Sequence, residues 1–164
     1  MSLKLSAPQP LTASQHLDEF ACGEATLDEW LKRRALSNQP SGASRTFVVA
    51  DPDGRVFGYY AMAAGAASHQ AATSSVRRNM RDSIPVMVLA RLAVDHRAQG
   101  IKLGASLLQD AVGRAVSVSQ HAGVRALFVH ALHERAKQFY EHYGFRASAL
   151  HPMALMLRLN TVKA

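Results

Sequence analysis

Residues 92–105 read LAVDHRAQGIKLGA and form the strongest local pattern in this sequence. They join the end of a long apolar run, which begins at Pro85, to a segment with helical spacing. The first N–H groups of a helix lack internal partners and its dipole is positive at that end, so a pyrophosphate can bind there. Gly100 and Gly104 let the backbone approach a ligand, and Arg97 can add charge. The alternative is an ordinary strand-to-helix turn.

The patterns on either side of this stretch predict alternating helices and strands. Apolar runs and period-3.6 spacing indicate the elements, and Asp51-Pro52-Asp53-Gly54 indicates a tight hairpin turn. The order, two helices and a meander followed by strand, helix, strand, helix and strand, predicts an α+β fold with a mixed, mostly antiparallel sheet flanked by helices. The expected elements are a helical region 12–39 broken near 22–23, strands 45–50 and 56–63, a loop 65–83 with one short helix, a strand 85–94, a helix 104–122, a strand 124–129, a helix 134–143 and a strand 154–159.

Composition sets the class of protein. With 164 residues and 48% hydrophobic residues, the chain suits one globular domain, 1–164. No run of about eighteen apolar residues is present, and the first ten residues do not read as a secretory signal. A single cysteine, Cys22, forms no internal disulfide and fits a reducing compartment. We therefore expect a cytoplasmic protein with no membrane segment.

The charge balance points toward phosphate-bearing partners. Nineteen Lys and Arg residues stand against twelve acidic residues, a formal net charge of +7 with a pI near 10.1. Such a surface attracts nucleotides and nucleic acids, although plain solubility is the alternative. The exposed basic groups expected from the pattern are Lys32, Arg33, Arg34, Arg77, Arg78 and Arg81.

A second pattern, ERAKQFYEHYGF at residues 134–145, places aromatic side chains on one face of a helix that Gly144 ends. Phe139 and Phe145 suit a core. Tyr140 shares this face, so the pattern by itself leaves it as either a core residue or a candidate for chemistry. Two further candidates are weak: His130 and His133 lack a third ligand with metal-binding spacing, and Cys22 lacks a partner base.

Both patterns resemble the GNAT acyltransferases. The GNAT pattern is Arg or Gln, two residues, Gly, one residue, then Gly or Ala, so Arg97 and Gly100 match it while Lys102 does not; a helical φ at Lys102 would let the turn survive. The second pattern is similar to the GNAT segment in which a tyrosine lies beside the CoA sulfur and "YGF" follows. The resemblance implies a GNAT fold in which acetyl-CoA lies in a splay between the strands at 85–94 and 124–129.

The N-terminal half resembles a narrower group, the TacT-like tRNA-acetylating toxins of type II toxin–antitoxin modules. Its motifs are Phe20-x-Cys22-Gly23, residues 27–35, residues 43–49, Gly58-Tyr59-Tyr60, residues 77–80 and Ile84-Pro85-Val86. The resemblance implies an enzyme that acetylates the free amino group of aminoacyl-tRNA and blocks translation. It also implies a ribbon-helix-helix antitoxin as partner and a homodimer.

The resemblance assigns roles to individual residues. Tyr140 would protonate the leaving thiolate, a proton transfer worth about 10²–10⁴-fold in rate. The six basic residues named above would contact tRNA phosphates. The residues expected to hold acetyl-CoA are Leu92, Ala93, Val94, Arg97, Gln99, Gly100, Ile101, Lys102, Leu103, Gly104 and Ala105.

Two other functions fit the same sequence. One is a GNAT enzyme that acts on a small amine or a protein N-terminus. The other is a non-catalytic module that binds nucleic acid or a partner protein, with Lys102 marking a decayed cofactor loop. No metal is expected in any of these cases. The identity of the aminoacyl-tRNA is not encoded in any motif.

Overall fold

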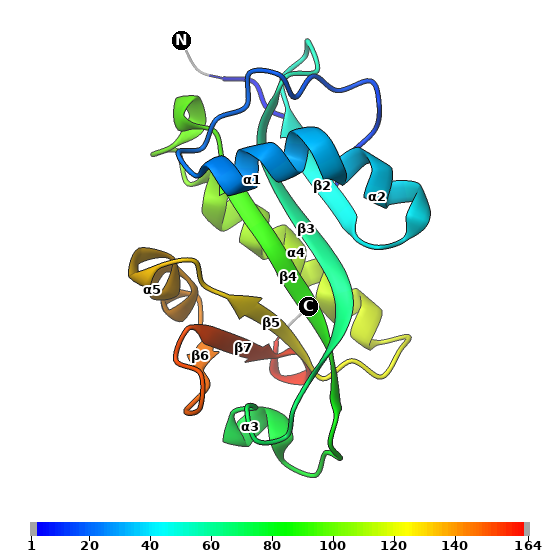
Figure 1. Cartoon of the computed structure of the whole chain (residues 1–164), viewed down its shortest axis with the longest axis vertical. Coiled ribbons are helices and arrows are strands. Elements are labelled where there is room, and N and C mark those ends of the chain that lie inside the picture. The colour runs from blue at the N-terminus through cyan, green and yellow to red at the C-terminus, as the bar shows by residue number, and fades with distance from the viewer. Residues whose placement is uncertain (1–2, 163–164) are drawn as a thin grey trace. The chain divides into compact units, whose positions relative to one another are not determined.

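The computed structural model describes residues 3–162 and contains a seven-stranded sheet with the hydrogen-bonded order β1-β2-β3-β4-β5-β7-β6 (Figure 1). The β4–β5 pair is parallel, and the β1–β2, β2–β3, β5–β7 and β6–β7 pairs are antiparallel. This confirms the mixed, mostly antiparallel sheet. The strands are β1 (Gln9–Pro10), β2 (Arg45–Ala50), β3 (Val56–Ala67), β4 (Ile84–Val94), β5 (Ala126–His130), β6 (Arg146–Ala147) and β7 (Ala154–Arg158). The helices are α1 (Ala25–Trp30), the π-helix η1 (Leu31–Ala35), α2 (Leu36–Ser41), α3 (Ser74–Arg77), the 3₁₀-helix η2 (His96–Ala98), α4 (Leu103–Ser119), α5 (Glu134–His142) and the 3₁₀-helix η3 (Leu159–Thr161).

The chain divides into two compact units, each with its own apolar cluster. Unit 1 comprises residues 1–63 and 90–111, and unit 2 comprises residues 64–89 and 112–164. β3, β4 and α4 contribute residues to both units. The expectation of one domain, 1–164, stays a prediction. Within residues 3–162, no helix is both long and apolar enough to cross a membrane.

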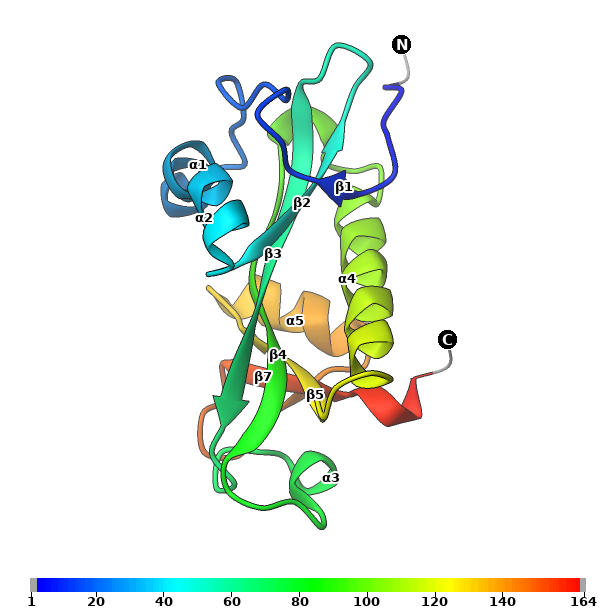
Figure 2. The same ribbon diagram turned by 90° about the vertical axis from the view of Figure 1, so that its right-hand side faces the viewer.

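Unit 1 is built on the β2–β3 hairpin. Its register pairs Arg45 with Met62 and Val49 with Gly58, and the tight turn between the strands is the one predicted from residues 51–54. Gly54 adopts φ +82°, which glycine tolerates without strain. Figure 2 shows α1 and α2 on one face of the hairpin and the first half of α4 on the other.

The predicted helical region 12–39 is correct only in its second half. Residues 12–24 contain no helix; instead the backbone of His16 bonds to both Gly54 and Val56, which ties this segment to the hairpin turn. Leu11 and Phe20 are buried as separate anchors rather than as members of a helical stripe. Tertiary hydrogen bonds therefore override the local helical spacing. The second half begins at Ala25, and Gly42 ends α2 with φ +75°.

Trp30 fixes the docking of α1 in unit 1. Its ring stacks on Tyr59 with centroids 6.0 Å apart, and the Arg91 guanidinium lies 4.3 Å from its centroid on a cation–π contact. The Tyr59 hydroxyl donates to the Leu27 carbonyl at 2.7 Å. Trp30 is thus partly buried against the apolar cluster of unit 1, with an arginine completing its environment.

Unit 2 contains the β4–β5–β7–β6 part of the sheet. The parallel pairing joins Val86–Leu89 to Ala126–Val129 and ends there, while β4 continues to Val94. The helix α3 buries Val76 in the cluster beneath it, together with Ile84, Val86, Ala126 and Met156. β1 and β6 were not predicted; each is only two residues long, too short to show an alternating pattern.

Gly58 tests the packing of β3 against α4. A Cβ at this position would lie 3.0 Å from Leu107 Cδ1 and 3.1 Å from Leu103 Cδ2. We expect Gly58→Ala to lower the free energy of unfolding by about 1–3 kcal/mol through overpacking. Gly113→Ala on α4 is the control, because a Cβ at this position would meet nothing within 4 Å. Alanine there should stabilise the helix by up to about 1 kcal/mol. Urea denaturation of both variants measures the change in stability. Equal midpoints for the two variants would contradict the close packing of Gly58 against Leu103 and Leu107.

Candidate active site

The turn from β4 to α4 is organised around Asp95, whose side chain is fully buried. Its carboxylate accepts hydrogen bonds from the backbone N–H groups of Ala21 (3.0 Å) and Arg97 (2.8 Å). The Arg97 guanidinium binds both carboxylate oxygens, with Nε at 2.8 Å and Nη2 at 3.1 Å. The turn is therefore tied to the segment that precedes α1.

Burial alone would raise the pKa of Asp95. The hydrogen bonds from Arg97 and Ala21 and the charge of Arg97 outweigh burial and hold the pKa below its ordinary value. Asp95 is thus an ionised structural carboxylate, fully engaged with donors, and it is not available as a general base.

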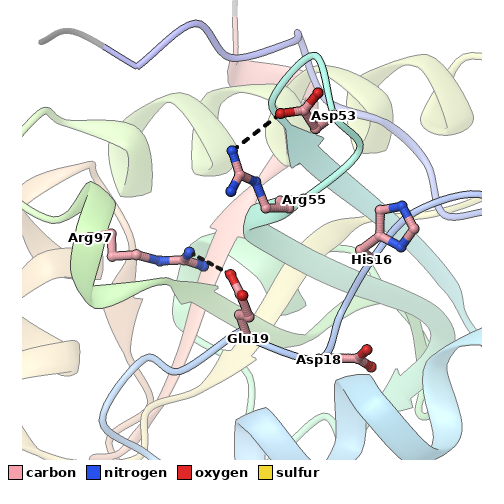
Figure 3. A pocket seen from close by; sticks show the side chains of 6 residues that line it. All are labelled: His16, Asp18, Glu19, Asp53, Arg55 and Arg97. Atoms are coloured by element: carbon pink, nitrogen blue, oxygen red, sulfur yellow. Dashed lines mark hydrogen bonds and ion pairs between the residues drawn. The ribbon is translucent and has the colours of Figure 1, made fainter.

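Arg97 also lines a surface cleft of unit 1 with a volume of about 360 Å³ (Figure 3). Its Nη1 atom binds Glu19 at 3.2 Å, and its guanidinium lies 4.5 Å from the Phe57 ring centroid. In the same cleft Arg55 binds Asp53 at 3.3 Å. The positive charge of Arg97, which was expected to bind a pyrophosphate, is therefore paired with the carboxylates of Asp95 and Glu19. The role of Arg97 in cofactor binding stays a prediction.

The expectation of a helical φ at Lys102 is wrong. Lys102 adopts φ +63° and Gly100 adopts φ +88°, both in the left-handed region that favours glycine. α4 begins at the next residue, and the Lys102 carbonyl accepts the Ser106 N–H at 3.2 Å. Read from Gln99 instead of Arg97, the GNAT pattern places its first glycine at Lys102 and its last at Gly104. The left-handed conformation of Lys102 supports that frame.

The turn presents groups that suit a diphosphate. The N–H groups of Leu103, Gly104 and Ala105 open a 17-residue helix and have no intrahelical acceptor. Ile101 and Lys102 are exposed, and among residues 3–162 no carboxylate neutralises the Lys102 ammonium. Gln99 braces the loop through Nε2, which donates to the Val94 carbonyl at 3.0 Å. Leu92, Ala93 and Val94 lie beyond the last β4–β5 pair, so they are not paired to β5.

Tyr140 lies on α5 in unit 2, as the sequence predicts. It is 6% exposed and packs against Phe139 and Phe145, with centroids 5.2 and 5.5 Å away. Burial raises the pKa of Tyr140 well above that of a free phenol. The side chain therefore keeps its proton at cellular pH. His133 caps the helix by accepting the Ala136 N–H at Nδ1, 3.1 Å away.

The six basic residues predicted to contact tRNA are all exposed, but they belong to different units. Lys32, Arg33 and Arg34 lie on η1 in unit 1, where Arg33 pairs with Glu29 at 2.9 Å. Arg77, Arg78 and Arg81 lie on and after α3 in unit 2. Their role in tRNA binding stays a prediction.

The Cys22 thiol is structural in character. Burial, followed by the Asp28 carboxylate, raises the pKa of Cys22 to about 11, so the thiol stays protonated and is a poor nucleophile. Among the residues that the structure describes, no group of three His, Cys, Asp or Glu side chains is arranged to hold a metal ion.

Sequence reasoning missed three arginines of unit 2. Arg125 and Arg158 donate to backbone carbonyls around α3, and Arg146 lines a cleft. A charged residue at either end of an apolar strand was the only signal for Arg125 and Arg158. For Arg146 it was the position directly after the YGF motif.

Comparisons with known proteins agree with this geometry. Residues 13–153 match the family described as the acetyltransferase (GNAT) domain. A tRNA-acetylating toxin of Mycobacterium tuberculosis (strain ATCC 25618 / H37Rv) is 46% identical over 159 residues, covering 97% of this chain and 95% of that protein. The structure of AtaT complexed with acetyl-methionyl-tRNAfMet has a TM-score of 0.88 at 28% identity and covers 96% of both chains.

A further solved structure is a tyrosine-to-phenylalanine mutant of the toxin AtaT bound to the C-terminus of the antitoxin AtaR and to acetyl-CoA. It has a TM-score of 0.82 at 28% identity, covering 96% of this chain and 94% of that one. This chain belongs to the GNAT acetyltransferase family and, within that family, to the tRNA-acetylating toxins.

Asp95→Asn tests the turn. The amide retains the shape but turns a donor toward Arg97, so we expect a loss of about 3 kcal/mol in the free energy of unfolding at pH 7. Because the folded pKa of Asp95 is depressed, its contribution is present above the unfolded value of about 4 and is lost as the pH falls through the folded pKa. The difference from wild type should therefore shrink below pH 4. Asp53→Asn, at an exposed carboxylate, should leave the urea midpoint unchanged.

Lys102→Gly tests the left-handed turn. Removing the Cβ relieves a conformation that costs a non-glycine residue about 1–2 kcal/mol, partly offset by the greater entropy of glycine in the unfolded chain. We expect the ligand-free variant to unfold at a higher temperature than wild type, by calorimetry. Lys102→Asn should lie between them, since asparagine tolerates this region. A less stable glycine variant would argue against strain at this residue.

Proposed function

We propose that this chain is an acetyl-CoA-dependent N-acetyltransferase that acetylates the free amino group of aminoacyl-tRNA and thereby blocks translation. The observation that carries the proposal is the 46% identity to the tRNA-acetylating toxin over 97% of the chain. Because this similarity includes the N-terminal segment as well as the turn before α4, it supports the substrate and not only the fold.

Acetyl-CoA supplies an acetyl group activated as a thioester. On this chain, the opening N–H groups of α4 and the Lys102 ammonium suit its diphosphate. The part of β4 from Leu92 to Val94, which has left its pairing with β5, suits the amide groups of its pantetheine arm. A backbone N–H group of β4 near Leu92 would stabilise the negative charge that develops on the reacting carbonyl oxygen.

We assign Tyr140 as the general acid. As the new C–N bond forms and the C–S bond breaks, the phenol gives its proton to the departing sulfur and regains one from the substrate amine. A phenol is normally less acidic than a thiol, so this transfer is uphill in water. In a buried site the thiolate is destabilised along with the phenolate, so the raised pKa of Tyr140 is matched by a rise in the pKa of the thiol.

No strong general base is required at this site. A free α-amino group has a pKa near 7.7–8.0, and esterification of the neighbouring carboxyl lowers it further. Much of the substrate amine is therefore already neutral at cellular pH. This is consistent with the engagement of Asp95, which has no capacity left to accept a proton.

The partners of the relatives extend the proposal. We propose that an antitoxin of the ribbon-helix-helix class neutralises this chain, that the chain forms a homodimer, and that it acts in the cytoplasm, where aminoacyl-tRNA is found. AtaT bound to the C-terminus of AtaR supports an antitoxin partner. We further propose that the two units act as one catalytic domain, since the family match runs without interruption from residue 13 to 153.

Tyr140→Phe tests the assignment. We expect kcat for transfer of labelled acetyl from acetyl-CoA to total charged tRNA to fall about 10²–10⁴-fold. KM for acetyl-CoA should change little, and toxicity on induction should disappear. The raised pKa of Tyr140 also predicts that wild-type activity does not decline between pH 7 and 9 through loss of its proton. Near wild-type acetylation by the phenylalanine variant would rule out the assignment.

Peptide N-termini and polyamines serve as competing substrates in the same assay. If the wild-type protein acetylates them and leaves charged tRNA untouched, the proposed function is wrong while the GNAT chemistry stands.

A further inference from the structure

The net charge of the chain resides in unit 2. Unit 1 contains nine Lys and Arg residues and nine acidic residues, so its formal charge is zero. Unit 2 contains ten basic residues against three acidic residues, which accounts for the whole net charge of +7. A polyanion is therefore attracted to unit 2 far more strongly than to unit 1.

Unit 2 also has an open cleft with a volume of about 710 Å³. This is within the range of pockets that hold a small organic ligand. Arg77 and Arg146 line it, together with the polar side chains of Gln70 and Thr73 and the buried ring of Phe145. The cleft combines cationic, hydrogen-bonding and apolar groups.

The two cleft arginines carry unneutralised charge. Among residues 3–162, neither Arg77 nor Arg146 makes an ion pair or a side-chain hydrogen bond. The cleft of unit 1 differs in this respect, because its arginines, Arg55 and Arg97, are both bound to carboxylates. Of these two clefts, that of unit 2 is the one whose arginines have no carboxylate partner among residues 3–162.

Two further arginines hold the Arg77 side of the cleft in place. Arg125 donates to the carbonyls of Val76 (3.0 Å), Ser75 (3.3 Å) and Arg78 (3.0 Å), and Arg158 donates to Ser75 (3.3 Å). These bonds fix α3 without a carboxylate, so the positive charge is not cancelled. Burial lowers the pKa of Arg125, and the charges of Arg158 and Arg78 lower it further.

The cleft adjoins the helix that carries the proposed general acid. Glu141 on α5 and Gly144, two residues beyond its end, line the cleft, and the lining residue Phe145 packs against Tyr140 with ring centroids 5.5 Å apart. Phe145 also closes the helix end, donating its N–H to the Tyr140 carbonyl at 3.1 Å. A ligand in this cleft would therefore lie beside α5.

We propose that the unit 2 cleft binds the single-stranded 3′ end of the aminoacyl-tRNA, with Arg77 and Arg146 on its terminal phosphates. The inference rests on the proposed function and names where that substrate is held. The side chains of Ala147 and Ala149 give the cleft an apolar surface that suits a nucleobase, and Glu141 can accept a hydrogen bond from a ribose hydroxyl or a base amino group.

Arg146→Glu in the full-length protein tests the proposal. We expect KM for charged tRNA to rise roughly tenfold to hundredfold, as for loss of a hydrogen bond to a charged group, with KM for acetyl-CoA unchanged. The slope of log(kcat/KM) against log[salt] should become shallower by about one. Arg77→Glu should behave alike. Melting temperatures of all variants establish that they are folded.

Arg135→Glu is the matched control. It makes the same charge change at an exposed position on α5 of unit 2, outside the cleft. We expect less than a threefold change in KM for charged tRNA. If Arg135→Glu and Arg146→Glu raise KM equally, a general field and not the cleft attracts the tRNA, and the proposal fails. It also fails if neither variant changes KM.

A short substrate identifies the part of the tRNA that is bound. An aminoacylated oligonucleotide with only the terminal CCA should show the full Arg146→Glu effect. If the effect appears with whole tRNA and vanishes with the short substrate, the cleft contacts the acceptor stem, and the single-stranded assignment is wrong.

Binding separates this proposal from the proposed function. Fluorescence anisotropy of a labelled, uncharged RNA ending in CCA requires no catalysis. If this RNA binds wild type and binds Arg146→Glu at least tenfold more weakly, while charged tRNA is never acetylated, then the cleft assignment stands and the proposed function fails. If wild type and Arg146→Glu acetylate charged tRNA equally, the proposed function stands and the cleft assignment fails.

Discussion

A fully buried carboxylate, Asp95, fixes the turn on which the candidate site depends. Removing an ion from water is costly, and here four donors from Ala21 and Arg97 offset that cost. The result is that β4, the start of α4 and the segment before α1 share one anchor. The turn geometry is therefore set by the protein itself before any ligand arrives, which lowers the conformational cost of binding.

Much of the fold was predictable because local patterns coincide with tertiary structure. The turn at residues 51–54 specifies the hairpin, and the apolar run after Pro85 specifies the strand β4. The continuous apolar run also suggests a strand covered on both faces, but Pro85 and Ala90 are exposed. Residues 12–24 could not be predicted, because their helical spacing is outweighed by backbone bonds from His16 to a turn some forty residues later. The edge strands β1 and β6 could not be predicted either, since two residues show no period.

The candidate site was predictable in its positions and less so in its electrostatics. Tyr140 lies on the expected helix, and the turn before α4 has the expected open N–H groups. The engagement of Arg97 by Glu19, 78 residues away, leaves no trace in a local pattern. The left-handed conformation of Lys102 contradicts the preference of its own residue type. The concentration of the net positive charge in unit 2 could not be predicted, because each unit is made of segments that are far apart in the sequence.

The carbonyl acceptors of Arg125 and Arg158 have a consequence for the energetics of the substrate complex. Both guanidinium groups are held by neutral partners, so unit 2 folds against mutual repulsion among its cations. Any polyphosphate that binds there removes part of that repulsion as well as forming its own contacts. Folding and substrate capture are thus thermodynamically linked, and the complexed protein should resist heat and proteases better than the isolated chain.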